Sequence, residues 1–145
     1  MIKVIWTAVA AFFIFSVGSN FIYIDPINGC FIKLLPSWDF NFNQYRVKEG
    51  LIILKNALPD DYKDVCKRID TIDPNFDCGK SEGGCYWPGN PKRISVSTAN
   101  STANWVAAVI IHEACHSKQD IEQRPLNEAE CHKENDRVLK GLTVH

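Results

Sequence analysis

The chain has 145 residues, six of them cysteine, and its acidic and basic residues almost cancel, leaving a formal net charge of −1 at pH 7. This length provides for one small domain. The charges are interspersed and form neither a basic face nor an acidic tail, so we expect no nucleic-acid partner.

The first predicted element is an apolar segment at the N-terminus. Residues Val4 to Ile24 include no charged side chain, and a run of about 20 apolar residues can cross a bilayer as a helix. The short Met-Ile-Lys start, the apolar stretch to Phe15 and the small residues after it also fit a cleaved signal peptide. Residues 1–24 are therefore predicted to be a signal peptide or a signal-anchor transmembrane segment. The rest is expected to be exported, periplasmic or extracellular, and held at the membrane by residues 4–24 if they are not cleaved.

An irregular linker or N-terminal extension is predicted for residues 25–50, which contain several turn-forming prolines and glycines. A compact α+β domain is assigned to residues 51–145. Its first element is expected at 51–55 (LIILK), a short apolar run typical of a buried strand.

A helix is predicted to follow from Leu58-Pro59, because proline and acidic residues are typical of a first turn and apolar residues recur at helical spacing as far as Ile72. Residues 77–91 are rich in glycine and predict a loop. Polar and apolar residues alternate over 92–98, which indicates a strand.

All six cysteines follow the apolar segment, and an even number in a small exported domain predicts up to three disulfides. They are Cys30, Cys66, Cys78, Cys85, Cys115 and Cys131. Cys78 and Cys85 are expected to bridge the loop at 77–91 or to tie it to Cys66. No CxxC pair occurs, which argues against a cysteine zinc site.

Two helices are predicted in the last third of the chain. Residues 100–102 (Asn-Ser-Thr) supply capping side chains before the apolar run 105–120, WVAAVIIHEACHSKQD. A further helix is expected from residue 125 or 126 to residue 139, with Gly141 ending it.

The run at 105–120 contains the motif HExxH, formed by His112, Glu113 and His116. Residues four apart lie on the same side of a helix, so both imidazoles can reach one ion. Glu113 is turned by about 100° from His112, which places its carboxylate beside such an ion and not on it. Zn²⁺ lowers the pKa of a bound water toward neutrality, and a neighbouring carboxylate can take the proton. The alternative is a packed helix with two hydrogen-bonded core histidines.

Residues 109–117 (VIIHEACHS) resemble the extended signature of HExxH zinc metallopeptidases, in a minimal gluzincin-like (zincin) form. Valine lies three residues before the first histidine and the surrounding residues are uncharged, whereas Lys118 stands where a hydrophobic residue is usual. The resemblance implies that His112 and His116 bind zinc and that Glu113 is the general base. It also implies a short sheet packed on the HExxH helix, followed by a second helix that carries a ligand.

A third protein ligand is expected, because catalytic zinc usually has three and leaves the fourth position to water. Metzincins place glycine where this chain has Gln119, so Glu122, at their third-ligand position, is set aside. The sequence LNEAEC looks like the second gluzincin motif, and the resemblance points to Glu128 as the ligand. Glu130 and His132 remain alternatives for the third ligand. Glu130 could instead be solvated or contact one of the residues that bind the metal.

His132 stands where many gluzincins have an aspartate that hydrogen-bonds to a zinc-bound histidine. It could support a ligand, replace one, or be an exposed histidine. His132 and Tyr86 are candidates, by residue type alone, for the group that stabilises the oxyanion formed from the substrate carbonyl.

Cys115 and Cys131 lie three residues after His112 and Glu128, respectively. If the two helices converge on one ion, a Cys115–Cys131 disulfide would clamp them together; two separately buried thiols are the alternative. By the same resemblance, the strand at 92–98 corresponds to an edge strand that binds extended substrates.

The sequence therefore predicts an exported zinc metallopeptidase, a hydrolase of peptide or protein substrates with Zn²⁺ as its cofactor. Two other functions remain open. One is a catalytically inactive zinc-binding module that recognises a partner, and the other is a disulfide-stapled structural protein tethered to the membrane.

Overall fold

The computed structural model describes residues 20–36, 43–74, 83–98 and 101–143. Their fold is α+β, as predicted, with a five-stranded sheet and helices packed against it. The strands are β1 (Ile22–Asp25), β2 (Cys30–Leu34), β3 (Thr71–Asp73), β4 (Gly84–Tyr86) and β5 (Arg93–Val96), and the helices are α2 (Asn43–Ala57), α3 (Pro59–Arg68), α4 (Ala103–Ile121) and α5 (Glu128–Leu142).

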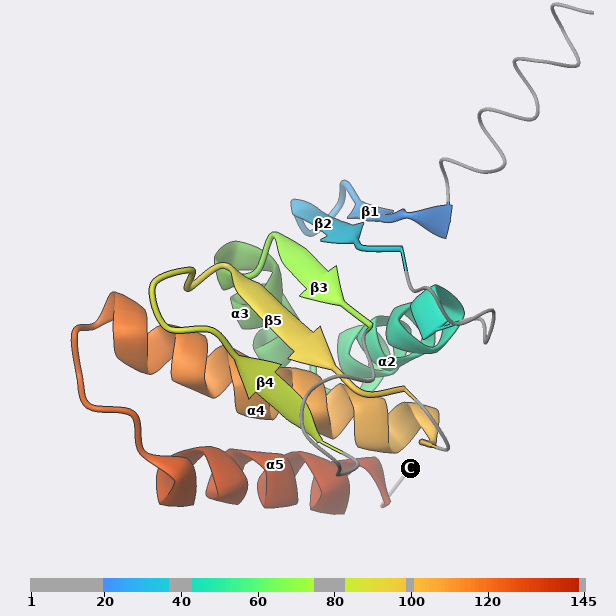
Figure 1. Cartoon of the computed structure of the whole chain (residues 1–145). Coiled ribbons are helices and arrows are strands. Elements are labelled where there is room, and N and C mark those ends of the chain that lie inside the picture. Colours follow the sequence, from blue (N-terminus) through green and yellow to red (C-terminus); the bar gives the residue numbers. More distant parts are fainter. Residues whose placement is uncertain (1–19, 37–42, 75–82, 99–100, 144–145) are drawn as a thin grey trace, which may run out of the picture.

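The sheet has the strand order β1-β2-β3-β5-β4 (Figure 1). β2, β3 and β5 run parallel, whereas β1 and β4 pair with their neighbours in the antiparallel direction. Along β2 the residues Cys30, Ile32 and Leu34 are buried and the two between them are exposed. This alternation is typical of a sheet that packs on helices through one face.

α4 is the central helix of the domain. It contacts α2, α3, β4 and β5, and α5 packs along it (Figure 1). Residues 106–111 are all buried. A helix that is covered from several sides must be apolar on several sides, which accounts for the unbroken run VAAVII before the first histidine.

The apolar run at 51–55 was predicted to be a strand. In the structure it belongs to the second half of α2. Val47, Leu51 and Leu54 are buried, at spacings of four and three residues, whereas Ile52 is 47 % exposed. The prediction was wrong because a short apolar run cannot distinguish a buried strand from a helix, and the helical spacing becomes visible only when residues before 51 are included.

The region 25–50, expected to be irregular, contains β2 and the first half of α2, and β1 ends at its first residue. Ile22 and Ile24 of the predicted apolar segment belong to β1 and pair with Lys33 and Phe31 of β2. The part of that segment before residue 20 lies outside the described residues. Within 20–36, 43–74, 83–98 and 101–143, no helix is both long and apolar enough to cross a membrane.

α3 begins at Pro59, as predicted, but ends at Arg68 and not beyond Ile72. Ile69 is already extended, and Ile72 pairs with Ile94 of β5. The apolar spacing of Ile72 fits both a helix and this buried strand, and pairing with β5 decides between them. The predicted loop at 77–91 likewise contains a strand, β4, in its described part.

Two disulfides are described in full, Cys30–Cys66 between β2 and α3, and Cys115–Cys131 between α4 and α5. The second confirms the predicted clamp. The first excludes the expected bond from Cys66 to the glycine-rich loop. Cys85 is also disulfide-bonded, and Cys78 lies outside the described residues.

Candidate metal centre

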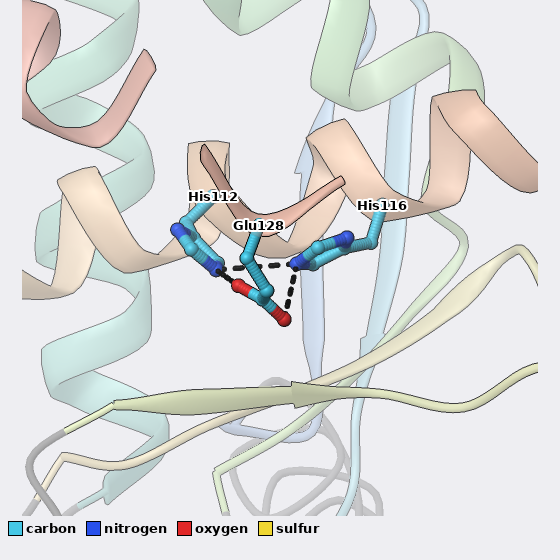
Figure 2. A group of neighbouring side chains, drawn as sticks. All are labelled: His112, His116 and Glu128. Carbon is cyan, nitrogen blue, oxygen red and sulfur yellow. Dashed lines mark hydrogen bonds and ion pairs between the residues drawn. The ribbon is translucent and has the colours of Figure 1, made fainter. Parts of the chain in front are cut away.

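α4 carries both histidines of the HExxH motif in its middle turns. The helix begins after Thr102, whose hydroxyl accepts a hydrogen bond from the backbone N–H of Trp105 at 3.2 Å. Thr102 is one of the three predicted capping residues, and it satisfies an N–H group that has no partner within the helix. His112 and His116 are four residues apart and therefore point in the same direction (Figure 2).

Glu128 is the first residue of α5, and the structure brings it to the two histidines (Figure 2). The Nε2 atoms of His112 and His116 lie 3.3 Å apart. One carboxylate oxygen of Glu128 lies 3.3 Å from His112 Nε2, and the other lies 3.3 Å from His116 Nε2. The predicted trio thus meets at one point from two helices.

Each histidine nitrogen lies 3.3 Å from a different carboxylate oxygen of Glu128, and one ligand atom from each of the three residues lies within 4.8 Å of the other two. Two imidazole nitrogens and a carboxylate form a donor set that attracts a divalent cation. His112, His116 and Glu128 could therefore hold a metal ion, with Glu128 reaching it from the exposed side, since 70 % of its side-chain surface is accessible.

Glu113 lies beside the three side chains and is not one of them. It is 3 % exposed and lines the same cavity as the histidines. Burial, with a smaller contribution from the charge of Glu128, raises the pKa of the Glu113 carboxyl to about 8. A cation held by the trio would favour the ionised carboxylate and lower that pKa again.

The cavity in front of the trio has a volume of about 410 Å³ and is lined by residues of β4, α4 and α5. Its apolar lining comes from Tyr86, Trp105, Val109 and Leu126. Polar groups therefore converge in a hollow with an apolar part beside them, an arrangement typical of small-molecule and substrate sites.

The other predicted candidates lie around the trio. His132 lines the cavity, with its ring centroid 4.8 Å from that of His112 and its Nε2 atom 3.9 Å from Glu128. Its side chain is 70 % exposed. Glu130 forms ion pairs with Arg124, and Glu122 does the same from the other side, so neither carboxylate joins the trio.

Tyr86 of β4 also lines the cavity, but its hydroxyl donates a hydrogen bond to Asp120. Burial and this hydrogen bond raise the pKa of Tyr86. The ring centroids of Tyr86 and His116 are 6.1 Å apart. The carboxylate of Asp120 therefore holds the Tyr86 phenol near the C-terminal end of α4.

Two residues at the site were not predicted to contribute to it. Gln119 touches His116 from the side opposite the trio, with Oε1 at 3.2 Å from His116 Nδ1. Gly84 of β4 faces Glu113 so closely that a Cβ atom there would lie 2.7 Å from the glutamate Oε1 and Cγ atoms. Gln119 lies three residues after His116 on α4, a helical spacing that could have indicated the contact, whereas the contact of Gly84 depends on tertiary structure and leaves no local pattern in the sequence.

The edge strand next to the site is β4 and not the predicted strand at 92–98. That predicted strand is β5 (Arg93–Val96), and it lies between β3 and β4. Among the described strands, β4 is the last of the sheet, and its residues line the cavity. The prediction placed the edge one strand too far along the chain because β4 was read as a loop.

Comparisons of the chain with protein families, curated proteins and solved structures find no match.

Proposed function

We propose that the chain is an exported zinc metallopeptidase of minimal gluzincin type. The observation that carries the proposal is the convergence of one ligand atom each from His112, His116 and Glu128 to within 4.8 Å of one another. Two imidazole nitrogens and a carboxylate oxygen are a donor set that catalytic zinc uses. Zinc bound there would polarise a peptide carbonyl and make a water molecule acidic enough to lose a proton near neutral pH.

Glu113 has the position and environment of the general base. Its carboxylate is buried beside the trio in the wall of the cavity. With a cation at the trio this carboxylate would be ionised, so it could take a proton from water and pass it to the leaving amine. The proton would therefore stay within the site between the two steps.

The edge of β4 offers a place for an extended substrate. A peptide added to β4 as a further strand would lie along the cavity that β4 lines. Main-chain hydrogen bonds would hold the peptide, and the apolar side chains of Tyr86, Trp105 and Val109 would face its side chains. Extended peptide segments are therefore the proposed substrates.

The disulfides support an exported location. Cys30–Cys66 and Cys115–Cys131 are both formed in the structure, and such bonds persist in oxidising compartments. The apolar residues that precede β1 are the proposed export signal, or the membrane anchor if they are retained.

The proposal is tested by cleavage of a broad peptide library by the zinc-loaded chain and its Glu113→Gln variant. Loss of a general base is expected to lower the rate by about 10²–10⁴-fold, with the zinc content unchanged. Glu122→Gln is the matched control, because Glu122 pairs with Arg124 outside the cavity. Undiminished cleavage by Glu113→Gln, or no cleavage by the zinc-loaded wild type, would refute the proposal.

A further inference from the structure

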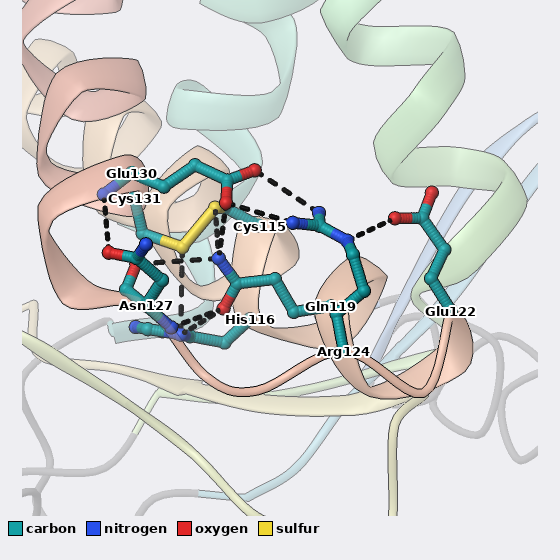
Figure 3. Close-up of polar contacts among 8 residues, drawn as sticks. All are labelled: Cys115, His116, Gln119, Glu122, Arg124, Asn127, Glu130 and Cys131. Atoms are coloured by element: carbon teal, nitrogen blue, oxygen red, sulfur yellow. Dashed lines mark hydrogen bonds and ion pairs between the residues drawn. A yellow bond between two sulfur atoms is a disulfide. The ribbon is translucent and has the colours of Figure 1, made fainter.

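Gln119 is a polar side chain with no exposed surface, near the end of α4. Its amide contacts His116, Asn127 and Glu130, and thus joins the HExxH helix to the start of α5 (Figure 3). A buried amide must satisfy its hydrogen-bonding groups to be tolerated. The directions of these bonds determine which ring nitrogen of His116 carries a proton.

The orientation of the Gln119 amide follows from its neighbours. Its Oε1 atom accepts a hydrogen bond from the backbone N–H of Asn127 at 2.9 Å. Its Nε2 atom donates to the backbone carbonyl of Asn127 at 3.3 Å and to a carboxylate oxygen of Glu130 at 3.1 Å. The reverse orientation would place an amide NH₂ against an N–H and a carbonyl against a carboxylate, so only one orientation is satisfied.

His116 Nδ1 therefore faces acceptors alone. Gln119 Oε1 lies 3.2 Å from it and can only accept. The second neighbour is Cys131 Sγ at 3.5 Å, which carries no hydrogen because it is bonded to Cys115. In the neutral imidazole, Nδ1 must hold the proton, which leaves the Nε2 lone pair free toward His112 and Glu128.

The same amide fixes the position of Glu128. Asn127 is the N-cap of α5, and its side chain accepts from the backbone N–H of Glu130 at 3.2 Å. Gln119 binds both main-chain groups of Asn127 and the side chain of Glu130. Glu128 lies between these two anchored residues. Arg124 covers the cluster by pairing with Glu130.

We propose that Gln119 is the positioning residue of the metal centre, presenting Nε2 of His116 and setting the start of α5 so that Glu128 meets it. This rests on the proposed function for the identity of the metal. In many gluzincins the residue at the position of His132 supports a ligand histidine. Here His132 is exposed, and the proposal gives the supporting role to Gln119. Such outer hydrogen bonds fix the tautomer and orientation of metal-binding histidines.

The first test is the tautomer of His116 in the metal-free, oxidised wild type, read from ¹⁵N–¹H correlation spectra at a pH where its imidazole is neutral. The proposal expects a proton on Nδ1. A proton on Nε2 would overturn it. This measurement needs neither bound metal nor catalysis, so its outcome is independent of whether the chain is a peptidase.

The second test compares zinc dissociation constants of the wild type, Gln119→Leu and Glu122→Gln, with thermal unfolding of each as a check of folding. Loss of an outer hydrogen bond to a ligand is expected to raise the constant by about 10–100-fold in Gln119→Leu. Glu122→Gln is the control, because Glu122 pairs with Arg124 outside the cavity, so its constant should stay within about threefold.

A folded Gln119→Leu variant that binds zinc as tightly as the wild type would contradict the proposal. If that variant does not fold, the tautomer of the wild type still decides. A wild type with the Nδ1 tautomer and tight zinc binding that cuts no peptide would uphold the role of Gln119 and refute the peptidase.

Discussion

Glu113 lies against the backbone of β4, and this approach requires a residue without a side chain at position 84. A Cβ atom on Gly84 would be 2.7 Å from Glu113 Cγ and Oε1, and 2.7 Å from the carbonyl oxygen of Ser95. Real Cβ atoms do not come so close, so an added methyl group must displace the glutamate, the strand or both. Gly84 thus sets the place of the proposed base.

Gly84→Ala is expected to lower the rate of peptide cleavage by about 10²-fold, because small displacements of a catalytic group cost that much. The zinc content should be unchanged, since the closest contacts of the added methyl group are with Glu113 and Ser95. Gly83→Ala is the control, because a Cβ atom there meets nothing within 4 Å. Equal rates for the two variants would show that Glu113 does not need this contact.

The proposed ligands could be predicted from the sequence because each lies in a short motif. HExxH fixes the relative positions of His112 and His116 through helical spacing alone, and LNEAEC marks Glu128 by resemblance. The link that Gln119 makes to α5 and the contact of Gly84 could not be predicted. They arise from the approach of α5 to α4 and of β4 to α4, and neither approach follows from spacing along the chain.

The two helices that carry the ligand atoms are joined by the Cys115–Cys131 disulfide, which closes a sequence separation of 16 residues. On α4 Cys115 lies between the two histidines, and on α5 Cys131 lies three residues after Glu128. Clamping the helices restricts the separations that Glu128 and the histidines can sample. The disulfide should therefore affect metal affinity as well as folding.

Replacing both Cys115 and Cys131 by serine is expected to lower the free energy of unfolding by about 3 kcal/mol, the loop-closure value for this length. Zinc affinity of the folded variant should also fall. The double replacement of Cys30 and Cys66 is the control, because that bond joins β2 to α3, away from the trio. Chemical unfolding and zinc titration measure the two effects. An equal loss of zinc affinity in both variants would refute the clamp.

α4 and α5 could be predicted as elements because long periodic runs with capping residues define them locally. The structure extends α5 to Leu142, past the predicted stop at Gly141, whose nearest neighbour across the core is Leu58. β3 and β4 have three residues each. Strands this short are defined by their pairing with β5. No local pattern therefore distinguished β3 from the end of a helix, or β4 from a loop.

At the scale of the whole molecule, a buried polar cluster joins the β1–β2 hairpin to α2 and α3. Asp25 is 5 % exposed. Its carboxylate pairs with Lys55 of α2 at 2.9 Å and accepts hydrogen bonds from Asn28 at 2.8 Å and Tyr62 of α3 at 2.9 Å. The bond to Lys55, more than that to Asn28, holds the pKa of Asp25 well below its ordinary value of 3.8.

This cluster predicts a specific acid sensitivity. Because the pKa of Asp25 is lower in the folded state than in the unfolded chain, the ionised carboxylate stabilises the fold above pH 3.8, its ordinary pKa. That stabilisation is lost as the pH falls from this value toward the folded pKa. Asp25→Asn should unfold more easily at neutral pH and show a flatter dependence of stability on pH in this acidic range.

Denaturant unfolding of wild type and Asp25→Asn at several acidic pH values measures the difference. Asp60→Asn is the control, since the Asp60 side chain is fully exposed. If the wild type and Asp25→Asn lost stability with the same slope below pH 3.8, Asp25 would not be the group responsible.

The central claim is that His112, His116 and Glu128 together hold one zinc ion. Elemental metal analysis of the purified, oxidised full-length chain tests it most directly, with His116→Ala and Glu128→Ala beside Glu122→Ala as the control. We predict about one zinc per chain in the wild type and in Glu122→Ala, and loss of zinc in the other two variants. A folded wild type that binds no zinc, or a His116→Ala variant that keeps it, would contradict the claim.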